Sequence, residues 1–169
     1  MPELPAKSPG ESAVTMTQMI LPGDANPLNA AFGGKVMEWI DVCGGVAAQR
    51  HCRRVVVTAS MDDLHFHVPI GIGWIVTLCA RVLAAFHTSM EVGVMVWAEN
   101  PLTGERHLAT SALLTFVALD EKRNKVPVPP LVLNTPEEHA AFEEAQARRR
   151  ERLARKQDST SWQRVMGAS

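Results

Sequence analysis

One segment restricts the fold of this chain more than any other, the stretch of helix-forming residues from Lys35 to Gln49. It is apolar on nearly every side, whereas a helix at the surface of a globular protein is apolar along one stripe only. Such a helix has to be covered all round, so we expect it to be buried at the centre of the fold. A sheet covers only one of its sides, and a second subunit is a natural cover for the remainder.

The residues that follow this helix are rich in Val, Thr and other residues that favour strands. We predict strands at 54–61, 75–86, 88–99 and 107–119, and a short edge strand before the helix at 14–21. The turn at 100–104 contains the Pro and Gly that a hairpin between the last two strands needs. One buried helix and an antiparallel sheet of about four or five strands predict an α+β fold in which the sheet wraps around the helix, the hotdog arrangement.

A second helix is predicted at 136–156. Thr135 is a suitable N-cap, Pro136 suits the first turn, and a capping-box Glu follows. Acidic residues come first and arginines last, which matches the helix dipole. We expect residues 1–13 to be disordered and 157–169 to form a loose tail, which leaves a single domain at 14–156.

The totals exclude several classes of protein. A chain of 169 residues with a net charge of −1 has no general attraction to nucleic acid or to an anionic membrane, and no apolar run is long enough to span a bilayer. The first twenty residues do not match a secretion signal. Cys43, Cys52 and Cys79 cannot all pair and form no C-x-x-C motif, so we expect reduced thiols in a cytoplasmic protein, with neither nucleic acid nor a membrane as a partner.

Asp41 is the unusual residue on the apolar helix. The only other acid between Val36 and Ala48 is Glu38, one turn earlier, and Gly44 and Gly45 follow one turn later. Two consecutive glycines each cost a helix about 1 kcal/mol relative to Ala, which suggests a close approach by another backbone or by a ligand. A buried carboxylate needs partners or a function. On composition alone a structural role, as a cap or ion-pair partner, stays open.

The start of the same helix is a second signal. Gly33 and Gly34 place flexible backbone N–H groups where the first turn of a helix has unpaired donors. Such donors stabilise an oxyanion or polarise a carbonyl, although most Gly-Gly pairs are only turns. Asn26, in the preceding loop, has an amide that serves the same purpose or simply stabilises its turn.

These residues carry a resemblance to a known family. The stretch L-P-G-D-A-N-P-L-N-A-A-F-G-G-K-V-M-E-W-I-D-V-C-G-G-V-A-A at 21–48 resembles the signature of hotdog acyl-CoA thioesterases, namely bacterial YciA-type enzymes and the brain-type and brown-fat-inducible acyl-CoA hydrolases of animals. The segments at 57–64, 85–92, 102–104 and 147–153 agree with it. The resemblance runs from about residue 16 to residue 156 and implies hydrolysis of acyl-CoA thioesters to a carboxylic acid and CoA.

The resemblance also implies roles for individual residues. It places the catalytic acid on Asp41 and a second catalytic residue on Asn26, which act together across a subunit seam. A chain with one hotdog unit then works as a homodimer, and three dimers forming a hexamer is the usual assembly. The implied CoA contacts are Ala59, Ser60, Met61, Thr88, Ser89, Met90, Arg148, Arg149 and Arg150, although a solvated helix face remains the other reading of the arginines. Trp74, His67 and Val68 depart from the family pattern, so substrate preference does not carry over.

The expected mechanism needs no metal or other cofactor, because a thioester is already an activated acyl group. The carbonyl lies against the N–H groups of Gly33 and Gly34, Asn26 holds the carbonyl or the water, and Asp41 acts as general base or as nucleophile. Three rivals remain. His65 and His67 alternate along a strand and would make half a metal site, a hotdog dehydratase would need a catalytic His near Asp41, and an inert acyl-CoA sensor would share the fold.

Overall fold

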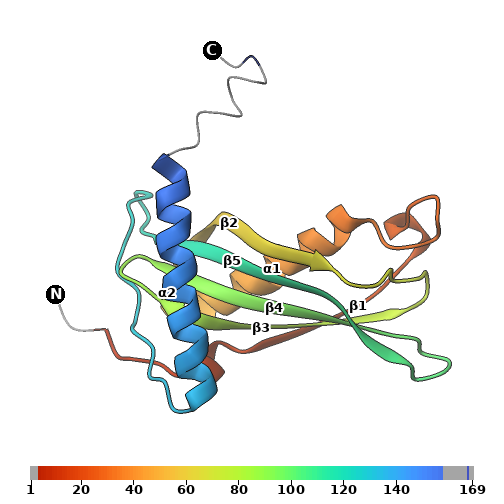
Figure 1. Cartoon of the computed structure of the whole chain (residues 1–169), viewed down its shortest axis with the longest axis horizontal. Coiled ribbons are helices and arrows are strands. Elements are labelled where there is room, and N and C mark those ends of the chain that lie inside the picture. Colours follow the sequence, from red (N-terminus) through yellow and green to blue (C-terminus); the bar gives the residue numbers. More distant parts are fainter. Residues whose placement is uncertain (1–3, 158–166, 168–169) are drawn as a thin grey trace.

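The computed structural model describes residues 4–157 and 167, so the predicted tail beyond Gln157 lies outside the described residues except for Gly167. Within these described residues the structure has five strands and two α-helices (Figure 1). No helix in the described part of the chain is long and apolar enough to cross a membrane. The elements are the short 3-10 helices η1 (Pro9–Ser12) and η2 (Pro22–Asp24), the strands β1 (Val14–Met19), β2 (Val55–Phe66), β3 (Ile75–Ala85), β4 (Ser89–Glu99) and β5 (Arg106–Leu119), and the helices α1 (Gly33–Cys52) and α2 (Pro136–Gln157).

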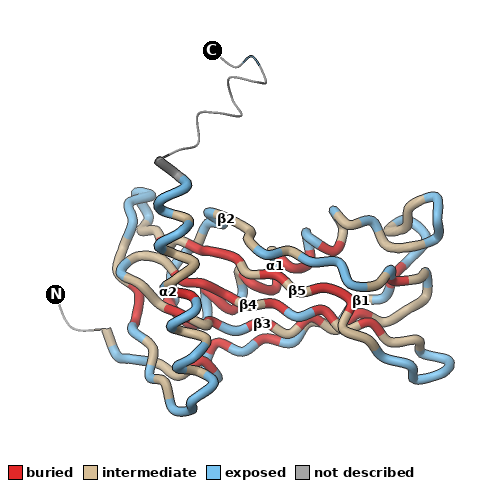
Figure 2. The backbone as a smooth tube through the Cα atoms, viewed as in Figure 1, coloured by how far each residue is buried: buried red, intermediate tan, exposed pale blue. Residues whose placement is uncertain are grey.

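The strands form one antiparallel sheet in the order β1-β3-β4-β5-β2. Alternate residues of a strand point to opposite faces, so Val92, Val94 and Val96 of β4 turn toward α1 and are buried, while Glu91 and Met95 lie on the other face. Figure 2 shows that buried residues recur along β3, β4 and β5, whereas β2 and α2 are largely exposed. The predicted hotdog fold is therefore confirmed, a central helix held by an antiparallel sheet.

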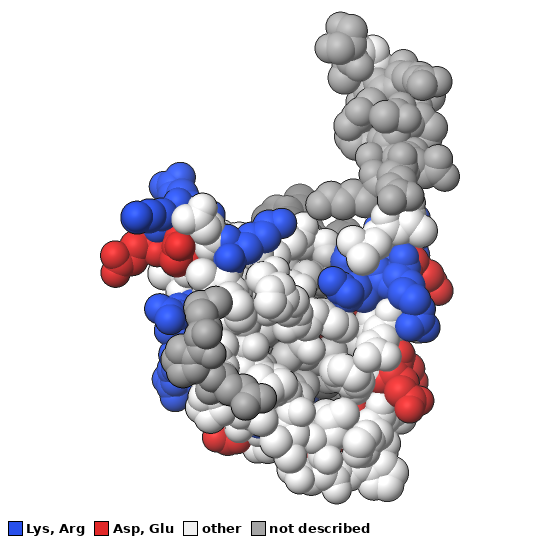
Figure 3. Space-filling view, turned by 90° about the vertical axis from the view of Figure 1, so that its left-hand side faces the viewer, with Lys and Arg blue, Asp and Glu red and all other residues white. Residues whose placement is uncertain are grey.

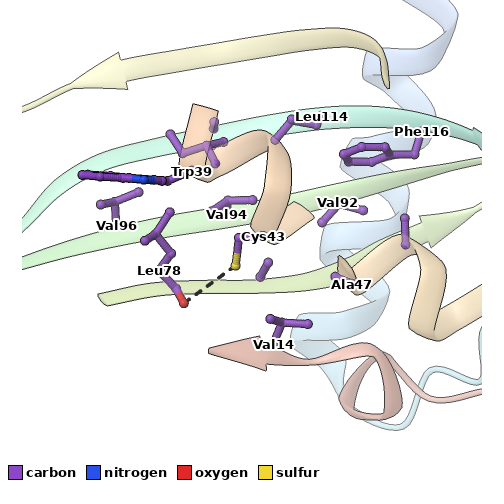
Figure 4. Packing of buried hydrophobic residues seen from close by; sticks show 14 of the residues in the cluster. Val14, Trp39, Cys43, Ala47, Leu78, Val92, Val94, Val96, Leu114 and Phe116 are labelled. Atoms are coloured by element: carbon purple, nitrogen blue, oxygen red, sulfur yellow. Dashed lines mark hydrogen bonds between the residues drawn. The ribbon is translucent and has the colours of Figure 1, made fainter. Parts of the chain in front are cut away.

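Helix α1 packs on the sheet through residues of one side, among them the fully buried Ile40, Cys43 and Ala47 (Figure 4). Gly44 is part of this contact, because a Cβ at that position would lie 3.1 Å from the Phe116 ring. The Gly44 backbone is thus approached closely by an aromatic side chain of its own sheet. Burial in this layer also raises the pKa of the Cys43 thiol to about 11.

The opposite side of α1 is open in the single chain. Met37, Val42 and Val46 expose between a third and a half of their surface, at 37%, 51% and 37%. One sheet covers one face of the helix only, as expected, and cover of the remaining face by a second subunit stays a prediction. What remains is an apolar face without a cover inside the subunit.

Strand β2 continues five residues beyond the predicted end at residue 61. The pair Asp62-Asp63 is unfavourable in a strand, but a register shift between Asp62 and His65 absorbs it, and Asp63 takes a left-handed conformation with φ of 48°. A second shift lies between Thr58 and Ser60. Because β2 is the last strand of the sheet, its outer edge has no strand beside it within the described chain.

Helix α2 lies on the face of the sheet opposite α1 and crosses the strands near one end (Figure 1). Its start follows the prediction, with the Glu138 N–H donating to Thr135 Oγ1 at 3.2 Å. Ala145 is fully buried against the sheet, and most of the helix is exposed. Figure 3 shows Lys and Arg side chains gathered on the flank formed by α2, just below the grey tail.

The segment before β1 differs from the expected disorder for residues 4–13; residues 1–3 lie outside the described part. The Lys7 Nζ donates to the carbonyl of His51 at 2.7 Å, and the Lys7 backbone N–H donates to the carbonyl of Pro130 at 3.0 Å. Ser12 is buried, and its hydroxyl accepts the Val82 N–H at 2.9 Å. The polar composition of the segment predicts disorder, but these contacts to distant parts of the chain hold it in place.

Candidate active site

Asp41 is half-buried in the third turn of α1, where the helix meets strand β2. The Thr58 hydroxyl donates a hydrogen bond of 2.6 Å to Asp41 Oδ1. This is a short hydrogen bond, so the hydroxyl orients the carboxylate. Among the described residues no other hydrogen bond reaches this carboxylate, which leaves its second oxygen available.

Thr58 is the functional residue that sequence reasoning missed. A Thr in a strand is ordinary, and nothing in its spacing pointed to Asp41, which is 17 residues away. The segment 57–64 that contributed to the family resemblance does contain it. The signal that could have identified Thr58 was therefore its presence in that shared segment. The sequence interpretation instead assigned CoA contacts to the next three residues, 59–61.

The N-terminus of α1 has the unpaired donors that its glycines predict. In the described part of the chain the N–H groups of Gly33 and Gly34 donate no hydrogen bond, and a Cβ added at Gly34 would meet nothing within 4 Å. At about 1.5 Å per helical residue, these amides lie roughly 11 Å from Asp41 along the axis. Within one subunit, one thioester carbonyl therefore cannot contact these amides and the Asp41 carboxylate at the same time.

Asn26 is held by the loop before α1. Its Oδ1 accepts the backbone N–H groups of Leu28 at 2.9 Å and Ala30 at 3.2 Å, which is the turn-stabilising role that the sequence left open. The side-chain amide nitrogen of Asn26, Nδ2, donates no hydrogen bond within the described residues, so it remains free to bind a ligand. The single chain does not bring Asn26 into hydrogen-bond contact with Asp41.

The predicted CoA contacts on the strands lie together at the end of the sheet near α2, because the segments at 59–61 and 88–90 flank the same part of β5. Ala59 is exposed, and the Ser60 hydroxyl donates to Asp62 Oδ2 at 3.0 Å. Met90 is fully buried in the core and Met61 packs against the core. Met90 therefore presents no surface to a ligand in this subunit, while Thr88 and Ser89 remain half-exposed.

The three predicted arginines differ in their surroundings. The Arg148 guanidinium donates 2.6 Å and 3.2 Å bonds to Glu91 Oε1, and these bonds raise the pKa of Arg148. Glu91 is almost fully buried, so this ion pair fastens α2 to β4. The Arg149 guanidinium lies 4.7 Å from the centre of the Phe86 ring, and Arg150 is exposed.

A hollow of about 690 Å³ lies on the sheet face opposite α1 and does not include Asp41. Its lining is mostly apolar, with Leu83 and Met95 among its residues. Asp63 and Ser111 also line it, but no hydrogen bond joins this acid to this hydroxyl, so we place the site at Asp41, which does bind a hydroxyl. There the apolar outer face of α1 forms one wall, and the single chain supplies no opposite wall.

The rival sites lose support in the structure. The rings of His65 and His67 stack at 6.2 Å, and His67 Nε2 lies 3.2 Å from the Ser111 hydroxyl. Within residues 4–157, no three His, Cys, Asp or Glu side chains are grouped to hold a metal ion. Helix α1 extends to Cys52 and so includes His51, ten residues after Asp41. The His51 ring, however, faces the Pro129 carbonyl and not the Asp41 carboxylate.

Comparisons with known proteins identify the family to which the chain is similar. The model of the thioesterase superfamily matches residues 28–105, which include Asp41 and Thr58. The chain is 45% identical over 157 residues to an acyl-CoA thioester hydrolase, YkhA, of Bacillus subtilis, covering 93% of this chain and 91% of that protein.

Two similar solved structures add to this. A hexameric acyl-CoA thioesterase shares 38% identity with a TM-score of 0.86, over 90% of this chain and 98% of that one. The acyl-CoA hydrolase of Staphylococcus aureus, solved with butyryl-CoA and CoA, shares 32% identity with a TM-score of 0.86, over 96% and 99% of the two chains. That hydrolase was also solved as alanine variants of one asparagine, one aspartate and one threonine, which are 15 and 17 positions apart.

Proposed function

Because the chain belongs to the thioesterase superfamily and is an acyl-CoA thioester hydrolase, we propose that Asp41 acts on the thioester with the help of Thr58 and Asn26. The observation that carries the proposal is the 2.6 Å hydrogen bond from Thr58 to Asp41. Asn26, Asp41 and Thr58 follow one another at intervals of 15 and 17 residues, the same intervals as the asparagine, aspartate and threonine replaced in the S. aureus hydrolase.

The carboxylate performs the chemistry in one of two ways. As a general base, Asp41 takes a proton from water while the water oxygen attacks the carbonyl carbon, and the proton then passes to the leaving CoA sulfur. As a nucleophile, an Asp41 oxygen attacks the carbonyl carbon and expels the CoA thiolate, and water then attacks the Asp41 carboxyl carbon of the resulting mixed anhydride and releases the acid. A single turnover in ¹⁸O water separates the routes, because the nucleophilic route leaves an unlabelled oxygen of Asp41 in the product acid.

The carbonyl oxygen needs donors in either route. Suitable donors are the free N–H groups of Gly33 and Gly34 and the free side-chain amide of Asn26. These donors lie at or just before the start of α1, away from Asp41. We propose that a second subunit supplies them, so that each site combines Asp41 and Thr58 of one chain with the helix start and Asn26 of its partner. The reaction needs no cofactor, since the thioester is already activated.

The unpaired edge of β2 and the exposed outer face of α1 support the proposed dimer. Val42 and Val46 on the outer face of α1 are 51% and 37% exposed, and β2, whose Thr58 binds Asp41 of this helix, is the last strand of the sheet among the described residues. A second copy placed there would cover both surfaces. A trimer of such dimers is the proposed full assembly, and a hexameric relative supports it. The cytoplasm remains the proposed location, in keeping with three cysteines that are free thiols.

The proposed CoA groove runs from the site toward α2. The backbone and side chains at 59–61 and 88–90 lie along this path, and Arg149 and Arg150 are the arginines best placed to meet phosphates. Arg148 already pairs with Glu91, so we propose that it acts mainly by holding α2 in place.

A thiol-release assay with acyl-CoAs of two to sixteen carbons tests the proposal. The wild-type protein should release CoA from at least part of the series, and Asp41→Asn should lower kcat by about 1000-fold while its thermal midpoint stays within a few degrees. Wild-type turnover in the folded Asn variant would overturn the assignment of Asp41. Protection by acyl-CoA without release of CoA would instead favour an acyl-CoA sensor.

A further inference from the structure

The two glycines in the middle of α1 serve different purposes. Each costs the helix about 1 kcal/mol relative to Ala, so each calls for a physical reason. Gly44 has one inside the chain, because a Cβ there would lie 3.1 Å and 3.3 Å from two atoms of the Phe116 ring and 3.5 Å from Val94. Gly44 is buried, and these neighbours cannot easily move.

Gly45 has no such reason inside the chain. A Cβ at this position would meet only the edge of the Phe116 ring at 3.6 Å, which is an ordinary van der Waals contact. The residue lies within a regular helix and is not among the glycines with positive φ. Packing of the subunit would accept Ala at this position, and the helix would be more stable for it.

The space that Gly45 leaves open lies beside the catalytic carboxylate. Gly45 is one turn after Asp41, and a side chain on a helix leans toward the N-terminus over the preceding turn. A methyl group at residue 45 would therefore project toward Asp41. Thr58, which binds Asp41, is paired across the sheet with Phe116, whose ring edge forms the floor beneath Gly45.

We propose that Gly45 determines acyl specificity, because its missing side chain provides room for the acyl carbons next to the thioester carbonyl. This inference rests on the proposed function of Asp41. The space is bounded by the Phe116 ring edge and lies on the open, apolar face of α1 with Val42 and Val46, so its occupant is apolar. A carbonyl held at Asp41 places its α-carbon, and any branch on that carbon, in this space.

The experiment compares Gly45→Ala with Gly44→Ala. For each, kcat/KM is measured with acetyl-CoA, butyryl-CoA and the α-branched isobutyryl-CoA, together with the thermal midpoint and the mass of the assembly in solution. Gly45→Ala should keep or raise the midpoint and keep the assembly, while the ratio of kcat/KM for isobutyryl-CoA to that for acetyl-CoA falls at least tenfold. Gly44→Ala, the packing control, should lower the midpoint and leave this ratio within about twofold.

Three results would overturn the inference. They are an unchanged ratio in Gly45→Ala, an equal loss with all three substrates, or a smaller assembly, which would assign the glycine to contact with the partner subunit. Asp41→Asn measured alongside separates the two claims. If this variant is inactive while Gly45→Ala keeps the wild-type ratio, only the role of Gly45 fails; if it remains active, the proposed function of Asp41 fails.

Discussion

Helices α1 and α2 lie on opposite faces of one sheet and have similar lengths, but different forces hold them there (Figure 1). Helix α1 is held by apolar contact, with Ile40, Cys43 and Ala47 fully buried. Helix α2 buries Ala145, stacks Phe142 on Phe86, and is attached by charged side chains, above all by Arg148 to Glu91. The helix that carries Asp41 is thus the one that the core fixes in position.

This difference matters for catalysis. A general base or nucleophile has to be positioned within a fraction of an ångström, and a close-packed core gives that rigidity. A helix fastened by a few ion pairs opens at a lower cost in free energy than one buried in the core. We therefore expect substitutions in α2 to affect stability and CoA affinity. In α1, substitutions on the buried face should lower stability, and substitutions on the open face beside Asp41 should lower turnover.

The largest expected effect on stability comes from the attachment of α2. Arg148→Ala leaves the nearly fully buried Glu91 carboxylate without its partner and should lower the free energy of unfolding by about 3–4 kcal/mol. Denaturant titration measures the change. Arg150→Ala is the matched control, because this neighbouring arginine is exposed and should cost at most about 0.5 kcal/mol. Equal effects in the two variants would contradict the fastening role of Arg148.

The buried face of α1 should give the next effect. Ile40 is fully buried beside Asp41, and Ile40→Ala should lower the free energy of unfolding by about 3 kcal/mol through lost contacts and a cavity. Val42, on the exposed face, is the control, and Val42→Ala should cost the monomer well under 1 kcal/mol. If Val42→Ala proves as destabilising as Ile40→Ala, the outer face of α1 is already covered in solution, which would sharpen the argument for a dimer.

The smallest expected effect concerns the end of α1. His51 is fully buried, its Nε2 lies 2.7 Å from the Pro129 carbonyl, and its Nδ1 has no partner among the described residues. Burial lowers the pKa of His51 below 6.5. The hydrogen bond to the Pro129 carbonyl raises this pKa in part, and the nearby charge of Lys7 lowers it further. As the pH falls through about 6.5 the unfolded chain binds a proton that the folded chain does not, so stability declines, by about 1 kcal/mol per pH unit at most.

A His51→Gln variant tests this, because glutamine can also donate to the Pro129 carbonyl but does not titrate. Its unfolding free energy should fall less steeply than that of the wild type between pH 7 and pH 5. Identical slopes would show that other groups cause the acid sensitivity. The absolute stability of the variant does not enter the comparison, since only the two slopes are compared.

The long elements were predictable because their residues repeat with the period of a helix or a strand. Strands β3, β4 and β5 and helix α2 lie within one residue of the predicted ranges at each end. The second half of β2 was missed because Asp62 and Asp63 interrupt the strand pattern, and only the contact with β5 shows the shift that accommodates them. The order of residues 4–13 was missed for the same reason, since Lys7 is held by residues far along the chain.

The candidate site was predictable only in part. Asp41 stands out in the sequence because an acid on an apolar helix is costly. Thr58 does not, because a threonine is common in strands and its bond to Asp41 exists only after the helix and strand have packed. The same holds for the two glycines, which read as equivalent in sequence and differ only through the position of the Phe116 ring.

The central claim, that each site joins Asp41 of one subunit to Asn26 of its partner, is tested most directly by mixing two inactive variants. Asp41→Asn and Asn26→Ala are co-expressed with different affinity tags, and assemblies that carry both tags are assayed for CoA release. In a mixed dimer one site receives both substitutions and the other receives neither, so a doubly tagged dimer should show about half of the wild-type activity, and a doubly tagged hexamer of randomly paired dimers about a quarter. Mixed assemblies as inactive as either parent would contradict a shared site.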